Sequence, residues 1–255
     1  MTTITTTPIT VPQTILAEAL LFDLDGTLVD STEAVTKHWT AFGREIGADP
    51  STILQTAHGR RTIDTLAVFC PERANWDYVR EMEESIPRDH GEGAKILPGA
   101  QQLLIQTIAA GVPWAIVTSG SSPLARGWLG RMDLPVPETM VTAESVACGK
   151  PDPAGYTLAR DMLGLTSRSA QATTTSSAAA AKMSVVFEDS PAGIRAGRAA
   201  GCTVVGLVTS HTLDEVRAAE PHFVVRDLDG VRVLDKGNRT EVLLQVDSIV
   251  SEPVV

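Results

Sequence analysis

The feature that most constrains this chain is a series of short, uninterrupted apolar runs, each about as long as a buried β-strand. The first run is Ala19–Phe22, and it leads directly into Asp23. The later runs are Trp114–Val117, Val185–Phe187, Thr203–Val208 and Phe223–Val225. Strands that are apolar on both faces are typical of a parallel sheet that helices cover on both sides.

Helical patterns fill the intervals between these runs. They are Gly99–Ala110, Pro123–Arg131, Pro153–Leu163, Pro191–Ala200 and Leu213–Ala219. The alternation of strands and helices predicts an α/β fold with a parallel, Rossmann-like core sheet. Hydrophobic residues make up 43% of the 255 residues, which is ordinary for a globular chain that buries a core of this kind.

One long segment, between Ser31 and Leu97, breaks the alternation. It contains only helical patterns, which are Glu33–Ile46, Thr62–Phe69 and Trp76–Ile86. A helical block that directly follows the first strand predicts a helical domain at residues 31–97, inserted over the sheet. The core domain then consists of residues 15–30 and 98–255, and Pro98–Gly99 marks the return to it.

Three further stretches complete the predicted organisation. Residues 1–14 are rich in Thr and predict a flexible tail. The low-complexity segment Thr166–Lys182 predicts a mobile surface loop. Val231–Leu234 and Glu241–Val246 flank a polar turn and predict a terminal hairpin.

Composition excludes several classes of partner and compartment. The net charge of −10 argues against a nucleic-acid partner, because such proteins usually carry a basic face. The three cysteines fit no zinc spacing, and their odd number favours free thiols. No apolar run reaches the roughly 18 residues of a membrane span, and the first residues lack the basic start of a targeting signal. We therefore expect a cytoplasmic protein without a membrane partner.

The most specific motif is Asp23-Leu24-Asp25-Gly26-Thr27, at the end of the first apolar run. Ligands of open α/β sheets bind at the carboxyl edge of the strands, and both carboxylates emerge there. Gly26 permits a tight turn that keeps the backbone close to a ligand. An ordinary acidic turn would not require this order of residues after a buried strand.

Three other motifs follow predicted strands or precede a predicted helix. Thr118, Ser119 and Gly120 offer a hydroxyl and backbone N–H groups that suit phosphate oxygens, although such residues are common at strand ends. Lys150 lies between glycine and proline before a helix. Glu188 and Asp189 end another buried strand, and two acidic strand ends make an oxygen-rich site of the kind that Mg²⁺ prefers.

The four motifs, in this order, resemble the signature of the haloacid dehalogenase superfamily. The resemblance implies a phosphatase in which Asp23 is the nucleophile and Asp25 the general acid and base, while Thr118 and Lys150 hold the phosphoryl group. It also implies an Mg²⁺ site formed by Asp23, Asp189, the backbone carbonyl of Asp25, and Glu188 directly or through water. The inserted domain then corresponds to a helical cap, and we expect a monomer that acts on a small phosphorylated metabolite.

A closer resemblance, to fungal glycerol-3-phosphate and 2-deoxyglucose-6-phosphate phosphatases, implies a polyol or sugar phosphate as the substrate. Because the four motifs hold only the phosphoryl group, specificity is expected from the cap. The basic cluster His58, Arg60 and Arg61 is the candidate there, with a solvated surface cluster as the alternative. Three alternative functions remain open at this point. They are a sugar phosphomutase, a prenyl-diphosphate phosphatase and a non-catalytic member of the same fold.

Overall fold

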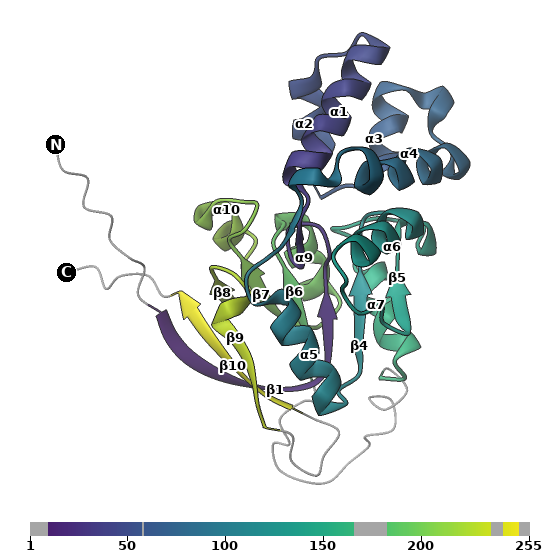
Figure 1. Ribbon diagram of the computed structural model, residues 1–255. Helices are drawn as coiled ribbons and strands as arrows, with labels where there is room; N and C mark the ends of the chain where they lie inside the picture. Colours follow the sequence, from purple (N-terminus) through teal and green to yellow (C-terminus); the bar gives the residue numbers. More distant parts are fainter. Residues whose placement is uncertain (1–9, 58, 166–182, 236–241, 250–255) are drawn as a thin grey trace, which may run out of the picture.

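The computed structural model describes residues 10–57, 59–165, 183–235 and 242–249, and Figure 1 shows a core sheet with a group of helices above it. His58 and the predicted loop Thr166–Lys182 lie outside the described residues. In the core, the strands β1, β4 and β6 point with their carboxyl ends toward these helices. The architecture is thus mixed α/β with a parallel central sheet, as the sequence predicts.

The central sheet has the strand order β5-β4-β1-β6-β7-β8, and all neighbouring pairs on this path are parallel. Its strands are β1 (Thr10–Phe22), β4 (Trp114–Val117), β5 (Thr139–Val141), β6 (Met183–Glu188), β7 (Thr203–Leu207) and β8 (Phe223–Val225). In the register of the sheet, Phe22 lies between Ile116 and Phe187. The ends of β1, β4 and β6 therefore meet at one edge, where the predicted motifs follow each strand.

Helices cover both faces of the sheet and bury the apolar residues of the strands. On one face lie α5 (Ala100–Ala110) and α6 (Ser122–Arg131). On the other lie α7 (Ala154–Met162), α9 (Pro191–Ala199) and α10 (Leu213–Ala218). The short 3₁₀ helices are η1 (Pro71–Arg73), η2 (Gly91–Gly93), η3 (Ala143–Ser145) and η4 (Leu228–Gly230). Burial on both faces explains why the strands read as continuous apolar runs.

The first strand begins earlier than the sequence predicts. Thr10–Ala17 pairs antiparallel with β10 (Val242–Ile249), whereas the prediction assigns residues 1–14 to a flexible tail. The partner strand lies near the other end of the chain, so no local pattern reveals the pairing. β10 also pairs with β9 (Val231–Asp235), which gives the antiparallel terminal hairpin that the sequence predicts.

The cap consists of the helices α1 (Thr32–Ile46), α2 (Pro50–Ala57), α3 (Thr62–Phe69) and α4 (Trp76–Asp89). Trp39, Phe42 and Leu66 belong to its own apolar core. The sequence prediction omits α2, although Asp49 and the proline at the first helical position are typical of a helix start. The Asp49 carboxylate accepts hydrogen bonds from the backbone N–H groups of Ser51 and Thr52.

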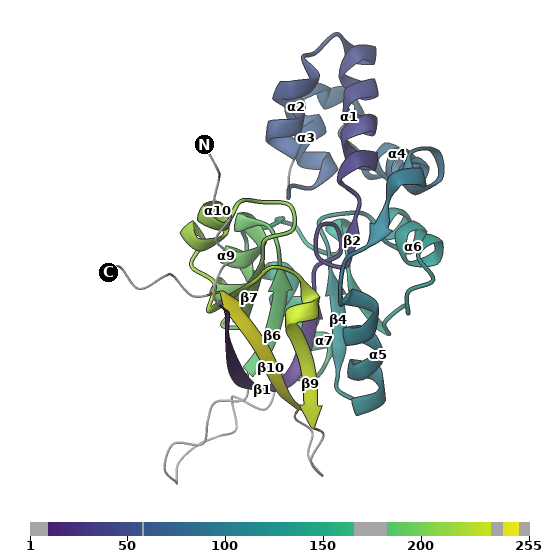
Figure 2. The same ribbon diagram turned by 60° about the vertical axis from the view of Figure 1, so that its left-hand side comes forward.

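Two short strands connect the cap to the core, as Figure 2 shows for β2. β2 (Val29–Asp30) pairs antiparallel with β3 (Lys95–Ile96), so the chain enters and leaves the cap side by side. Asp30 and Lys95 form an exposed ion pair of 3.5 Å across this connection. The connection begins just after the Asp23 motif, so the position of the cap is tied to that loop.

Candidate active site

The loop after β1 places two carboxylates at the edge of the sheet. The backbone N–H of Asp23 still donates to the carbonyl of Phe187 at 3.0 Å, so its position is fixed by the sheet. The chain then turns at Gly26, which has a φ of +88°, a conformation that side chains rarely adopt. A Cβ at this position would also collide with the carboxylate of Asp189, so the turn and the close approach both require glycine.

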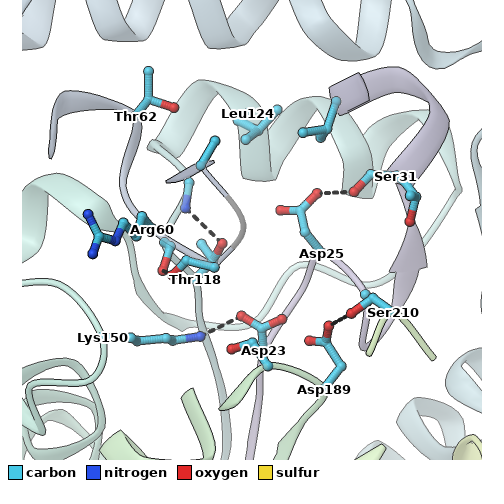
Figure 3. Close-up of a pocket in the computed structure, with 18 of the residues that line it drawn as sticks. Asp23, Asp25, Ser31, Arg60, Thr62, Thr118, Leu124, Lys150, Asp189 and Ser210 are labelled. Atoms are coloured by element: carbon cyan, nitrogen blue, oxygen red, sulfur yellow. Dashed lines mark hydrogen bonds and ion pairs between the residues drawn. The ribbon is translucent and has the colours of Figure 1, made fainter. Parts of the chain in front are cut away.

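Lys150 is the positive centre of the site. Its Nζ lies 2.5 Å from Asp23 Oδ1 and 2.5 Å from Glu188 Oε1, and it donates to the carbonyl of Val117 at 3.0 Å. Figure 3 shows the contact with Asp23. Burial alone would lower the pKa of Lys150, but the charges of Asp23 and Glu188 raise it above the ordinary value. The ammonium group is therefore a permanent positive charge beside Asp23.

Glu188 is fully buried and pairs with Lys150 through Oε1. Its Oε1 also accepts the hydroxyl of Tyr156 at 2.8 Å, and its Oε2 accepts the backbone N–H and the hydroxyl of Ser190, both at 3.1 Å. Glu188 does not line the cavity that contains Asp23 and Asp25. A glutamate with both oxygens engaged by protein donors fits the role of orienting the lysine.

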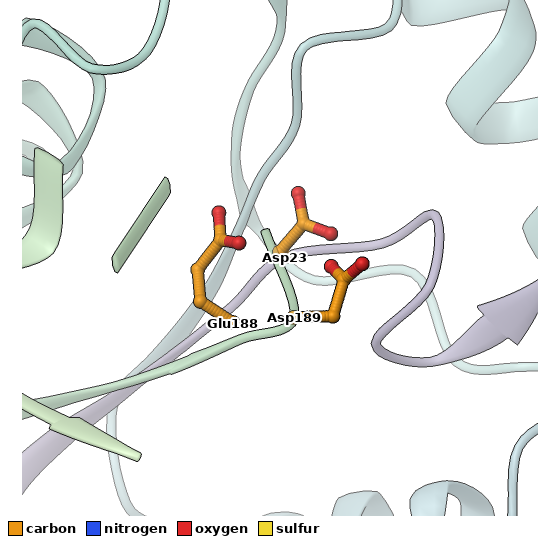
Figure 4. Close-up of side chains that lie close together, drawn as sticks. All are labelled: Asp23, Glu188 and Asp189. Carbon is orange, nitrogen blue, oxygen red and sulfur yellow. The ribbon is translucent and has the colours of Figure 1, made fainter. Parts of the chain in front are cut away.

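Asp189 extends from the neighbouring strand end toward the same space. Its Oδ1 accepts the hydroxyl of Thr27 at 3.3 Å, and its Oδ2 accepts the hydroxyl of Ser210. One carboxylate oxygen from each of Asp23, Glu188 and Asp189 lies within 4.8 Å of the other two. Figure 4 shows the three side chains close together. Burial raises the pKa of Asp23 well above its usual range, Lys150 opposes this, and the two neighbouring carboxylates add to it. One lysine against three buried carboxylates leaves an excess of negative charge that a divalent cation would neutralise.

Asp25 lies apart from this cluster, above Asp23 in Figure 3. Its Oδ1 accepts the hydroxyl of Ser31 at 2.6 Å. Burial raises the pKa of Asp25 to about 6, although the hydrogen bond from Ser31 acts in the opposite direction. A carboxyl group with this pKa exchanges its proton near neutrality, as a general acid and base must.

The loop after β4 supplies the polar wall of the site. Thr118 accepts the backbone N–H of Gly120 at 3.0 Å, which folds the loop back on itself. Ser119 donates to the carbonyl of Gly59 in the cap at 3.1 Å. Thr118, Ser119 and Gly120 all line the cavity together with Asp23, Asp25, Lys150 and Asp189. The structure therefore brings together the core residues that the four motifs predict.

The comparison with protein-family models decides the family. The model described as a haloacid dehalogenase-like hydrolase matches residues 17–201, which include all four motifs. The chain belongs to the haloacid dehalogenase-like hydrolase family. The resemblance inferred from the sequence is thereby confirmed.

Several curated relatives of this hydrolase are named as phosphatases or phosphohydrolases. It is 39% identical over 89% of its length to hexitol phosphatase A of Escherichia coli, of which the match covers 99%. It is 35% identical to glycerol-1-phosphate phosphohydrolase 2 of Saccharomyces cerevisiae, with 88% of each chain covered. It is 36% identical to 2-deoxyglucose-6-phosphate phosphatase 1 of the same yeast, with 91% of this chain and 96% of the relative covered.

A solved structure agrees with the fold of the hydrolase. A hydrolase from Pseudomonas syringae superposes with a TM-score of 0.64 at 23% sequence identity. The match covers 82% of this chain and 94% of that one. At this identity, the likeness supports the core sheet with its inserted helices and nothing finer.

Cap and core of the hydrolase enclose a cavity of about 120 Å³ above Asp23 and Asp25. Arg60 lines this cavity, is exposed, and forms no ion pair or side-chain hydrogen bond among the residues that the structure describes. Trp39 belongs to the apolar core of the cap and also reaches the cavity wall. Among the described residues of the cap, Arg60 is the only cation that lines the cavity.

Arg61 does not reach the cavity, although the sequence predicts it as a substrate-binding residue. Its guanidinium pairs with Asp64 at 2.8 Å and donates to the carbonyl of Val146 at 2.9 Å. The residue is only 8% exposed, and a Cβ at Gly149 would collide with its side chain. Arg61 thus joins the cap to the loop before Lys150, and this contact depends on packing between two domains that no local pattern encodes.

The sequence prediction omits several residues that shape the site. Ser31 and Ser210 position Asp25 and Asp189, and Tyr156 positions Glu188. Glu83 of α4 also lines the cavity and is only 2% exposed. Glu83 stands beside the exposed Glu84 in a charged helix, so the sequence offers no signal that distinguishes them.

Proposed function

We propose that the protein hydrolyses the phosphomonoester of a small polyol or sugar through an aspartyl-phosphate on Asp23. The observation that supports this most directly is the pair of carboxylates in one cavity. Asp23 is held by Lys150, while Asp25 is held separately by Ser31 and has a pKa of about 6. One carboxylate is thus placed to attack and the other to transfer protons.

In the first step, a carboxylate oxygen of Asp23 attacks phosphorus, and the bond from phosphorus to the substrate oxygen breaks. Asp25 in its protonated form gives its proton to the departing alcohol. Lys150 lies against Asp23 and stabilises the negative charge of the phosphoryl oxygens. Thr118 and the backbone around Ser119 and Gly120 hold the same oxygens from the other side.

In the second step, Asp25 is a carboxylate and accepts a proton from water. The resulting hydroxide attacks phosphorus, inorganic phosphate leaves, and the Asp23 carboxylate is restored. Closure by the cap limits the cavity to the water that Asp25 activates. Asp25 acts as the acid in the first step and as the base in the second. A pKa of about 6 suits both roles, because both protonation states are accessible near neutrality.

Asp23, Asp189 and the backbone carbonyl of Asp25 are the residues that would hold Mg²⁺. The excess of buried carboxylates over Lys150 fits such an ion. When bound, Mg²⁺ neutralises the charge of the transferring phosphoryl group. We assign Glu188 to the support of Lys150 instead of direct coordination, because its oxygens already accept hydrogen bonds from protein groups.

The substrate class follows from the names of the relatives and the size of the cavity. Hexitol phosphatase A, glycerol-1-phosphate phosphohydrolase 2 and 2-deoxyglucose-6-phosphate phosphatase 1 are named for small polyhydroxylated phosphates. A cavity of about 120 Å³, bounded on the cap side by Arg60 and Glu83, suits a small polar molecule. We therefore place polyol and sugar phosphates first.

A phosphate-release screen tests the proposal. The panel contains glycerol 1-phosphate, glycerol 3-phosphate, hexitol phosphates, 2-deoxyglucose 6-phosphate and p-nitrophenyl phosphate, each with Mg²⁺ and with a chelator. Asp23→Asn should lose several orders of magnitude in turnover, whereas the exposed control Asp133→Asn should match the wild type. Activity that survives in Asp23→Asn would overturn the mechanism, and phosphoryl transfer to a sugar without phosphate release would identify a mutase.

A further inference from the structure

Helix α6 begins directly after the phosphate-binding loop and lacks a cap from its own side chain. Its N-cap residue, Ser121, makes no side-chain capping hydrogen bond. The Ser121 hydroxyl is buried and has no hydrogen-bond partner among the described residues. The first backbone N–H groups of a helix need an acceptor, and a negatively charged one is favoured there.

Two carboxylates accept these N–H groups: Glu144 of the core accepts that of Ser122 at 3.0 Å, and the second carboxylate comes from the cap domain. Oε2 of Glu83 in α4 accepts the backbone N–H of Ser121 at 2.6 Å, across the boundary between the two domains. Oε1 of Glu83 accepts the hydroxyl of Thr62 in α3 at 2.5 Å. Among the described residues that the cap contributes to the cavity wall, Glu83 is the only acid. A buried carboxylate of the cap domain thus accepts the N–H of Ser121, which the side chain of Ser121 itself does not satisfy.

Thr62 links the contact between Glu83 and Ser121 to the loop that carries Lys150. The preceding residue, Arg61, donates to the carbonyl of Val146 at 2.9 Å and packs against Gly149, next to Lys150. The start of α3 therefore reaches the lysine loop directly and the phosphate-binding loop through Glu83. Both loops that would contact the phosphoryl group are joined to the same point of the cap.

We propose that Glu83 is a positioning residue that orders the phosphate-binding loop Thr118–Gly120 by docking on the N–H of Ser121 when the cap is closed. The inference rests on the proposed function, because it assigns the loop to phosphate. It explains why a glutamate is buried beside Asp25, where burial raises its pKa to about 7. A loop that gains this contact from the closed cap holds phosphate best when bulk water is excluded.

Three substitutions separate positioning from a purely structural role. Glu83→Ala removes the acceptor, and Glu83→Gln keeps an oxygen for the Ser121 N–H. Ser121→Pro removes the donor from the core side, and the φ of −73° at Ser121 suits proline. Glu84→Ala, an exposed neighbour on the same helix, is the matched control.

The measurements are kcat and KM for p-nitrophenyl phosphate, and binding of inorganic phosphate with Mg²⁺ by calorimetry. Glu83→Ala and Ser121→Pro should each lower kcat by roughly 10- to 100-fold and weaken phosphate binding, as expected for a displaced loop. Glu83→Gln should stay within a few-fold of the wild type, and Glu84→Ala should equal it.

Combining Glu83→Ala with Ser121→Pro should cost no more than either change alone, because both break the same contact. The proposal is overturned if Ser121→Pro, or a folded Glu83→Ala, keeps wild-type kcat and phosphate affinity while only its Tm falls. A wild-type protein that binds phosphate but turns over nothing in the panel contradicts the proposed function. In that case, the phosphate affinities of the variants still test whether Glu83 positions the loop Thr118–Gly120.

Discussion

At the scale of single residues, Arg60 and Arg61 show how neighbours of the same charge acquire different roles. Arg60 lines the cavity and forms no ion pair or side-chain hydrogen bond among the described residues, whereas Arg61 is buried against Asp64 and the carbonyl of Val146. The first is free to meet a substrate. The second connects the cap to the core, so we propose Arg60, and not Arg61, as the substrate-binding arginine of the cluster.

We expect Arg60→Ala and Arg61→Ala to fail in different ways. Arg60→Ala should leave Tm unchanged and lower kcat/KM by roughly 10-fold for the best polyol or sugar phosphate, but little for p-nitrophenyl phosphate. Arg61→Ala should destabilise the protein by about 1.5–3 kcal/mol, because buried carbonyls lose a charged donor, and should affect both substrates alike. Kinetics on the two substrates and thermal unfolding distinguish these patterns. Equal changes of kcat/KM and of Tm in the two variants would contradict the different roles assigned to Arg60 and Arg61.

The core motif residues could be predicted from the sequence, because the carboxyl ends of parallel strands must meet. Asp23, Thr118 and Asp189 each follow a buried apolar run, so their proximity is a consequence of the sheet. Arg61 and Glu83 could not be placed in this way. Their surroundings depend on how the cap rests on the core, and that orientation has no period or motif in the sequence.

At the scale of elements, β10 shows how tertiary pairing creates a strand that local signals only partly reveal. Its residues alternate between buried and half-buried along the whole strand. The alternation predicts a strand there, but not its antiparallel pairing with Thr10–Ala17, because the two segments are far apart in the chain. The sequence does not predict β5 or α2 for a related reason. Each element is short and gains its stability from neighbouring elements.

The alternation in β10 predicts unequal costs for two adjacent leucines. Leu244 is fully buried in the core, and Leu243 is only half-buried on the other side of the strand. Leu244→Ala should lower the free energy of unfolding by about 2–5 kcal/mol, and Leu243→Ala by clearly less. Chemical denaturation of the two variants measures the difference, and equal losses would show that β10 faces the core differently.

The contact between α4 and α6 predicts a pH dependence of stability. Burial raises the pKa of Glu83 from an ordinary 4.5 to about 7, so the folded state holds a proton that the unfolded state releases. The free energy of unfolding should therefore fall as pH rises from about 4.5 to about 7, by up to about 3 kcal/mol for this group alone. Glu83→Gln should lack this component, and exposed Glu84→Gln should retain it. Denaturation at pH 5 and pH 8 tests this; parallel losses in the wild type and Glu83→Gln would contradict it.

At the scale of the whole molecule, a chain with a net charge of −10 gathers three of its buried carboxylates at one edge of the sheet. Among Asp23, Glu188 and Asp189, the first two pair with Lys150, and Asp189 has His211 at 3.8 Å. Such an arrangement destabilises the metal-free protein, since like charges are held together out of water. It also makes stability sensitive to a bound cation. No helix among the described residues is long and apolar enough to span a membrane.

We therefore expect Mg²⁺ to raise Tm. At a concentration about 100 times its Kd, a single bound ion stabilises the folded state by about 2.7 kcal/mol, or roughly 5–10 °C for a chain of this size. Asp189→Asn should abolish the shift, and Asp133→Asn should preserve it. Thermal unfolding with Mg²⁺ and with a chelator gives the answer, and an undiminished shift in Asp189→Asn would place the ion elsewhere.

The pairing of β1 with β10 has a consequence for how the protein is made. The strand that ends at Asp23 has one half of its length, Thr10–Ala17, paired with residues 242–249. During translation, Thr10–Ala17 leaves the ribosome well before its partner strand, because the rest of the core sheet and the cap lie between the two segments in the chain. Until residue 249 is outside the exit tunnel, the first strand keeps an open edge that invites pairing with other chains. Nascent chains of this enzyme should therefore need protection by chaperones until translation has passed that point, and a prematurely terminated chain should aggregate instead of leaving a partly active enzyme in the cell.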